Sequence, residues 1–242
     1  MTAAPSLRFR GRARIDGQPL FPDIDLTIAA AKWTCLLGPS GVGKTTILRL
    51  IAGLSCAVDF TGQITTSDGH PSMGRVAYMA QSDLLFPWLD VHGNIGLGAR
   101  LRGERPDQAR MQDVIARTGL ADHLRKRPSE LSGGQRQRTA LARTLMEDRP
   151  IILLDEPFSA LDTRTRAEMQ ELTVELLAGR TVLLVTHDPA EAARLAHGAH
   201  VLMPERLHPI DLPDTPIARA IDDPATIRAQ SLMLGVLRQV PA

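Results

Sequence analysis

A glycine-rich loop between an apolar run and a helical pattern constrains the fold of this chain more than any other feature. The loop, GPSGVGKTT, starts at Gly38; the run Thr34–Leu37 before it predicts a buried strand, and residues 45–54 predict a helix closed by Gly53. Glycines remove side chains and allow positive φ, so that backbone N–H groups can turn toward an anion at the start of a helix. The pattern therefore predicts an α/β domain that binds the phosphates of a nucleotide.

The loop also assigns chemistry to individual residues. We expect Lys44 to reach the β- and γ-phosphates as a point charge, and the hydroxyl of Thr45 to bind the Mg²⁺ that bridges them. The expected nucleotide-binding residues are Gly38, Pro39, Ser40, Gly41, Val42, Gly43, Lys44, Thr45 and Thr46.

Two acids follow a second apolar run, Ile151–Leu154, which is typical of a parallel strand buried on both faces. Carboxylates at the end of such a strand must be paired or take part in chemistry. We expect Asp155 to hold Mg²⁺ through water and Glu156 to polarise the water that attacks the phosphate.

A third segment, LSGGQ, lies between the glycine loop and the acid pair. Ser132, Gly133 and Gly134 offer a hydroxyl and bare N–H groups at the start of a helix, which is a second anion site. The whole segment comprises Leu131, Ser132, Gly133, Gly134 and Gln135. One chain thus carries two predicted phosphate sites but a single set of hydrolytic residues.

These ordered motifs, with Gln81, Ser159–Asp162 and His187, closely resemble the ATP-binding cassette subunits of ABC transporters over about residues 7–205. The resemblance implies that two cassettes pack head to tail, with each ATP between the glycine loop of one and the LSGGQ of the other. It also implies that Gln81 senses Mg²⁺ and the membrane partner, Asp162 links the two sites, and His187 lies near the γ-phosphate.

The resemblance further implies a fold: an α/β P-loop ATPase core sheet with an antiparallel β subdomain and a helical subdomain over about residues 83–148. We expect the cassette to occupy residues 1–205 and a tail to occupy 206–242. A helix predicted over residues 224–240 is expected to pack onto the cassette; contact with a dimer mate or partner is the alternative. Its apolar residues are Ile227, Leu232, Leu234 and Leu237.

Composition narrows the functional class. The formal net charge is +1, and no apolar run approaches the ~20 residues that span a bilayer, so we expect no nucleic-acid partner and a membrane domain on another polypeptide. The N-terminal segment has no apolar signal region, and Cys35 and Cys56 lack metal-ligand spacing, which favours a reducing cytosol. The alternating Arg8, Arg10, Arg12 and Arg14 predict a solvated strand face; a basic face for RNA is the alternative.

Two positions depart from the family pattern. Where most cassettes carry an aromatic residue that stacks on adenine, this chain has Ile15, and Phe9 or Phe21 could take that role instead. The usual Gly-Glu turn before the loop strand is replaced by Ala31-Lys32, which we expect to alter only the turn.

A segment that starts FPWLDVHGN at Phe86 resembles cassettes of nitrate, sulfonate, taurine and thiamine-precursor pyrimidine importers. Phe86, Pro87 and Trp88 are expected to form part of a socket for a membrane-domain helix; the alternative is that Trp88 belongs to the core of the helical lobe.

The expected function is therefore an Mg²⁺-dependent ATPase subunit of a bacterial importer, peripheral on the cytoplasmic face of the inner membrane. Its expected partners are a second copy of itself, transmembrane permease subunits and, indirectly, a periplasmic solute-binding protein. A cassette protein that acts on ribosomes or DNA, and a nucleotide-gated assembly factor without transport, are the alternatives.

Overall fold

The computed structural model describes residues 4–238 and divides them into two compact units. The first, here called the sheet unit, takes residues 4–78, 149–155 and 178–238. The second, the helical unit, takes residues 79–148 and 156–177. The boundary falls between the two acids predicted to act together, because Asp155 belongs to the sheet unit and Glu156 to the helical unit.

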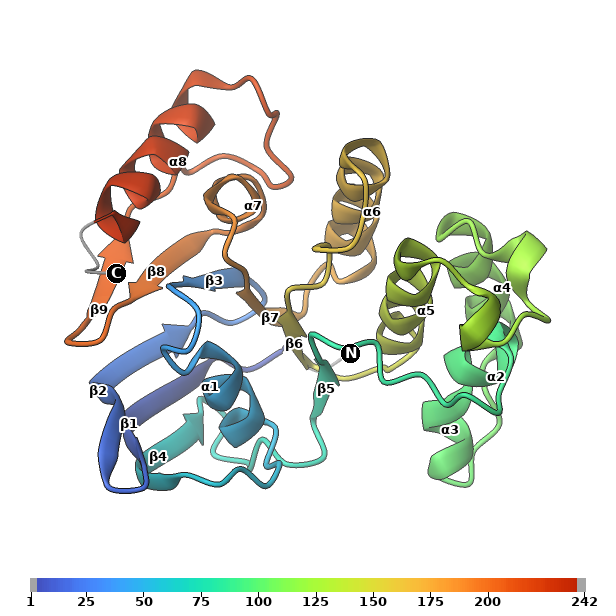
Figure 1. The fold of residues 1–242 in the computed structure, drawn as a ribbon, viewed down its shortest axis with the longest axis horizontal. Helices are drawn as coiled ribbons and strands as arrows, with labels where there is room; N and C mark the ends of the chain where they lie inside the picture. The colour runs from blue at the N-terminus through green and yellow to red at the C-terminus, as the bar shows by residue number, and fades with distance from the viewer. Residues whose placement is uncertain (1–3, 239–242) are drawn as a thin grey trace. The chain divides into compact units, whose positions relative to one another are not determined.

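The main sheet has six strands in the order β5-β6-β7-β3-β8-β9 (Figure 1). Every residue of β3 (Trp33–Leu37), β6 (Ile151–Asp155) and β7 (Thr181–Val185) is buried, and the three strands are parallel. Apolar runs without alternation fit this position, because a central parallel strand is covered on both faces. β5 (Val76–Met79) forms one edge next to β6.

A second sheet of three strands, in the order β2-β1-β4, is antiparallel. Its members are β1 (Leu7–Ile15), β2 (Gln18–Ile28) and β4 (Asp59–Thr66). Along β1 the arginines are exposed and the alternate residues Leu7, Phe9 and Ala13 are buried, as period-two alternation predicts. Arg8 pairs with Asp25 on the neighbouring strand. The basic row is thus a solvated sheet face, and the predicted antiparallel subdomain is confirmed.

Three helices complete the sheet unit: α1 (Lys44–Ile51), α7 (Pro189–Leu195) and α8 (Pro224–Leu237). Helix α1 buries Ile47, Leu48 and Ile51 in the apolar core shared with the antiparallel sheet. Asp188 and Asp223 cap α7 and α8 by accepting hydrogen bonds from first-turn N–H groups.

The tail differs from the expectation in two ways. It begins as a strand, because β9 (Leu207–Ile210) pairs antiparallel with β8 (Gly198–Leu202) at the edge of the main sheet. The helix that follows does pack against α7, but its buried residues are Thr226, Ala229 and Met233, whereas Ile227, Leu232 and Leu234 are exposed. Residues 239–240 of the predicted helix, and residues 1–3 and 241–242 of the predicted domains, lie outside the described residues.

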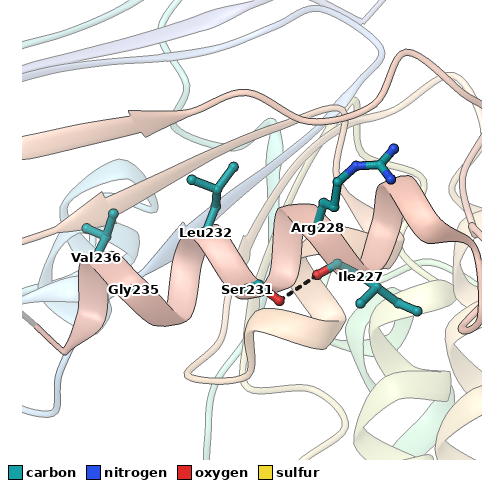
Figure 2. Close-up of a pocket in the computed structure, with 6 residues that line it drawn as sticks. All are labelled: Ile227, Arg228, Ser231, Leu232, Gly235 and Val236. Atoms are coloured by element: carbon teal, nitrogen blue, oxygen red, sulfur yellow. Dashed lines mark hydrogen bonds between the residues drawn. The ribbon is translucent and has the colours of Figure 1, made fainter.

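The exposed side of α8 carries a shallow groove of about 580 Å³ (Figure 2). Ser231 and Gly235 are small residues one turn apart, and Leu232 and Val236 project beside them. None of the residues that line this groove belongs to a predicted site. The packing of α8 therefore leaves several of its large apolar side chains, Ile227, Leu232 and Leu234, exposed.

A buried arginine ties the tail to α7. Arg219 donates from Nη1 to the carbonyl oxygens of Ala193 and Ala196, at the C-terminal end of α7, and from Nη2 to that of Pro213. In return, the carbonyl of Arg219 accepts a hydrogen bond from Arg194 Nε. A cation at a helix C-terminus is favoured by the exposed carbonyl dipoles there, so this contact stabilises the tail against α7.

The helical unit contains α2 (Val91–Ile95), α3 (Leu97–Leu101), α4 (Gln108–Arg117), α5 (Gly133–Leu145) and α6 (Thr163–Leu176). Two short 3₁₀ turns, Ala121–His123 and Pro128–Glu130, precede α5. Within residues 4–238, no helix combines the length and apolar character needed to cross a bilayer.

Candidate functional site

The glycine loop, Gly38–Thr46, follows β3 and includes the first residues of α1. Two of its glycines are required both by their backbone angles and by close neighbouring atoms. Gly38 has φ 153°, and a Cβ there would lie 2.5 Å from the carbonyl oxygen of Leu202. Gly43 has φ 101°, and its Cβ would lie 2.7 Å from the Phe21 ring. An L side chain at either position is therefore both strained and obstructed.

The start of α1 is suited to an anion. The N-cap of the helix is Gly43, which has no side chain to cap the first-turn N–H groups, and no acidic residue lies in the first turn. Lys44 is buried, and its Nζ donates to the carbonyl oxygens of Gly38 and Pro39 at 2.7 Å. The loop thus combines a fixed ammonium group with helix dipoles that favour phosphate.

Parallel pairing brings two predicted site residues and the glycine loop to the same end of the main sheet. Val185 at the end of β7 is paired with Asp155 of β6 on one side and with Leu36 of β3 on the other. Asp155, the glycine loop and His187 therefore all lie at or just beyond the carboxyl ends of neighbouring strands, where ligands bind in open α/β sheets.

The residues present fit Mg²⁺ bound to a nucleotide. Mg²⁺ in phosphate sites is held by one or two protein side chains together with phosphate oxygens and water. The Thr45 hydroxyl, exposed in the first turn of α1, and the Asp155 carboxylate supply that number. Asp155 is buried 3.5 Å from the hydroxyl of Tyr78, and burial together with this carboxylate raises the pKa of Tyr78 to about 12.

The turn that carries His187 is held by buried polar groups. The hydroxyl of Thr186 donates to Glu191 Oε2 at 2.7 Å and accepts a hydrogen bond from the backbone N–H of Asp188 at 3.1 Å. His187 itself is exposed between these two residues. Its backbone position is thus fixed from both sides while its imidazole remains accessible.

In the helical unit, the structure brings Gln81 and Glu156 together. Gln81 Nε2 donates to Glu156 Oε2 at 3.2 Å, although the residues are 75 positions apart. The backbone of Glu156 is left-handed, with φ 49°, a conformation that costs a non-glycine residue on the order of 1 kcal/mol or more. Such strain persists only where the surrounding structure enforces it, which is common at functional positions.

The LSGGQ segment forms a capped helix start. Ser132 caps α5 by accepting from the N–H of Gln135, and Gln135 Oε1 accepts in return from the N–H of Ser132. A Cβ added at Gly133 or Gly134 would meet protein atoms no closer than 3.5 Å, which is ordinary contact. Packing inside the unit therefore does not explain these two glycines, whereas close approach of a ligand to bare backbone would.

Asp162 caps α6 in the same way. Its carboxylate accepts from the backbone N–H of Thr165 at 3.1 Å, and hydrogen bonds from the hydroxyl and backbone of Thr165 lower the pKa of Asp162. This explains the aspartate locally and leaves its expected role between two sites as a prediction.

The structure excludes Phe9 and Phe21 as residues that stack on adenine. Phe9 and Phe21 are buried in the apolar core, with ring centroids 6.0 Å apart in an edge-to-face arrangement. They pack against each other and are not accessible to a nucleotide. Ile15 is 39% exposed and offers no ring.

Trp88 is 67% exposed, so the alternative that it belongs to the core of the helical unit is wrong. Its ring centroid lies 4.9 Å from that of Phe86, and Leu84 nearby in sequence is also exposed. Phe86 is half-buried, so the exposed apolar side chains of this segment are Trp88 and Leu84; such a cluster is typical of a surface that binds another protein.

Sequence reasoning missed Gln137, which lies two residues after the LSGGQ segment. Its side chain is buried and contacts the backbone at Glu156 and Ala160. Glutamines on helices are usually solvated, so no feature of the sequence distinguishes it from its neighbours.

Comparisons with known proteins agree with this arrangement. Residues 21–159 match the family model described as ABC transporter. The chain is 48% identical to the aliphatic sulfonates import ATP-binding protein SsuB 1 of Rhodococcus jostii, over 72% of this chain and 69% of that protein. It is 39% identical to the thiamine import ATP-binding protein ThiQ of Photorhabdus laumondii, over 84% of this chain and 89% of that protein.

A bacterial Atm1-family ABC exporter, solved with ATP bound, has a similar fold, with a TM-score of 0.73 and 26% identity. The similarity covers 84% of this chain but 38% of the exporter chain, so the chain spans well under half of that protein. The matched family, the relatives and the α/β fold confirm the resemblance to ABC transporter ATP-binding subunits that the sequence motifs indicated. The chain belongs to the ABC transporter family, as one of its ATP-hydrolysing transport subunits.

Proposed function

We propose that this chain drives import of a small solute by binding ATP between two copies of itself and hydrolysing it. The observation that carries the proposal is the LSGGQ helix start, where bare backbone at Gly133 and Gly134 has no packing reason inside its own unit. A second chain's nucleotide would provide that reason. The glycine loop, Asp155 and His187 would then serve one nucleotide, and LSGGQ the nucleotide of the other copy.

The hydrolytic roles follow from the chemistry of each side chain. Lys44, now held by two loop carbonyls, would exchange them for phosphate oxygens and neutralise their charge. Glu156 would orient the attacking water and accept its proton, with its carboxylate positioned by Gln81. His187 would donate to the γ-phosphate. Bound Mg²⁺, held by Thr45 and Asp155 and sensed by Gln81, supplies charge stabilisation to the phosphates.

The partners and the place of action are proposed on the same basis. Phe86 and Trp88 would receive a helix of a transmembrane permease, which would hold the chain as a peripheral subunit on the cytoplasmic face of the inner membrane. A periplasmic solute-binding protein would deliver the solute to that permease. Relatives named for aliphatic sulfonates and for thiamine support a cargo of the sulfonate or thiamine type. The resemblance of the segment that starts at Phe86 adds taurine, nitrate and thiamine-precursor pyrimidines to the proposed solutes.

ATP-driven dimerisation tests the proposal. In the Glu156→Gln background, which should cut turnover by ~10²-fold or more, ATP should convert monomer to dimer in solution and ADP should not. Adding Gly134→Asp places a carboxylate where phosphate must approach bare backbone, and should abolish the dimer by repulsion and steric block while monomer binding of ATP survives.

Lys44→Ala is the matched comparison, because it should weaken ATP binding to the monomer itself. If Gly134→Asp weakened monomer binding as severely as Lys44→Ala, LSGGQ would be acting within its own chain and the two-copy proposal would be wrong.

A further inference from the structure

Gln137 lies buried at the start of α5, between the LSGGQ segment and the turn that carries Glu156. It is in the second turn of the helix, and its side chain is 7% exposed. The predicted roles of LSGGQ and of Glu156 do not involve it. Its contacts nevertheless join these two parts of the helical unit.

Both ends of the Gln137 amide are used. Nε2 donates to the carbonyl oxygen of Glu156 at 3.0 Å and to Ser159 Oγ at 3.3 Å, and Oε1 accepts from the backbone N–H of Ala160 at 2.8 Å. The partners fix the orientation of the amide, because a carbonyl can only accept and a backbone N–H can only donate. A flipped amide would place like groups against each other at both ends.

The Glu156 turn needs such support. Its backbone is left-handed at φ 49°, a conformation that other contacts must enforce. The Glu156 carbonyl accepts from Ser159 Oγ at 3.1 Å as well as from Gln137. Gln81 holds the carboxylate of the same residue. Glu156 is therefore fixed through its backbone by α5 and through its side chain by the segment after β5.

We propose that Gln137 is a positioning residue that couples LSGGQ to the hydrolytic carboxylate of the same chain. The inference rests on the proposed function, in which LSGGQ contacts the nucleotide held by the other copy and Glu156 serves the chain's own nucleotide. Each chain then links two nucleotides through one buried amide. Engagement of α5 at one nucleotide holds the Glu156 turn in the geometry required at the other.

Gln137→Met tests this role, because methionine has a similar length and removes both the donor and the acceptor. The turnover number should fall by about 10-fold or more, since small misplacement of a reacting group is costly, while KM and monomer affinity for ATP stay near wild type. Gln137→Glu keeps the acceptor for Ala160 but sets a carboxylate oxygen against the Glu156 carbonyl, and should lower turnover further. It also serves as the test if the methionine variant does not fold.

Gln170→Met is the matched control, because Gln170 is a buried glutamine, 4% exposed, on α6 of the same unit. It should reproduce any loss of melting temperature but not the loss of turnover. Wild-type turnover in Gln137→Met, or an equal loss in both variants, would overturn the positioning role.

The dimer assay separates this inference from the proposed function. Gln137→Met in the Glu156→Gln background should still dimerise with ATP, because LSGGQ itself is intact. If Glu156→Gln alone does not dimerise with ATP, the two-copy proposal fails, whereas a turnover loss confined to Gln137 variants would still support local positioning of Glu156. If Gln137→Met abolishes the ATP dimer, Gln137 shapes LSGGQ rather than Glu156, and the coupling is refuted.

Discussion

Replacing Arg219 should reveal how strongly the tail is bound to the rest of the sheet unit. The guanidinium is almost fully buried and serves the carbonyls of Ala193, Ala196 and Pro213 and the hydroxyl of Thr215. Arg219→Met keeps much of the aliphatic stem but removes every donor. Buried acceptors that lose a partner cost roughly 1–3 kcal/mol each, and partial access of water to the more open Pro213 end reduces the total.

We therefore expect Arg219→Met to lower the free energy of unfolding of the sheet unit by about 3 kcal/mol. On the scale for a chain of this length, that corresponds to a fall in Tm on the order of 6–12 °C. Arg228→Met is the control, because Arg228 is an exposed arginine of α8 with no comparable set of buried acceptors, and it should change stability by less than about 0.5 kcal/mol.

The chain's tryptophans allow the sheet unit to be observed by itself. There are two, and Trp33 is buried in β3 of the sheet unit whereas Trp88 is exposed in the helical unit. In a Trp88→Phe background, urea unfolding followed by fluorescence reports Trp33 alone. A loss below about 1 kcal/mol for Arg219→Met would refute the reasoning, because it would mean that the buried carbonyls find other partners or water.

Three further predictions follow from single side chains. Tyr78 is the chain's one tyrosine, so the absorbance of its phenolate should titrate near pH 12 in the folded protein. Because the folded pKa is raised above the unfolded one, the free energy of unfolding should fall between pH 10 and 12. Asp155→Asn should lower the titration midpoint, and a native midpoint near 10 would contradict the assigned environment. Ile15→Tyr should tighten ATP by about 1 kcal/mol in a binding titration, and an unchanged affinity would show that adenine does not reach residue 15. Trp88→Ala should spare basal ATPase and Tm but abolish stimulation by the reconstituted permease, and a large fall in Tm would instead indicate a packing role.

The parts of the site that depend on residues close together in the chain could be predicted from the sequence. A glycine loop between a strand and a helix, a serine and two glycines at a helix start, and an acid pair after an apolar run each involve residues close together in the chain. Residue type and short spacing define these motifs, so the sequence predicts their chemistry. Parallel pairing of the apolar strands then follows, and with it the common edge for Asp155, the loop and His187.

Contacts between side chains far apart in the sequence, and the faces that become buried, could not be predicted and were found in the folded structure. Gln137 contacts Glu156 because the Glu156 turn packs beside α5. Phe9 and Phe21 are inaccessible to adenine because they fill the core. Helix α8 buries Ala229 and Met233 and leaves Ile227, Leu232 and Leu234 exposed. Burial and pairing of this kind depend on the shape of the opposing surface, and no periodicity within one segment contains that information.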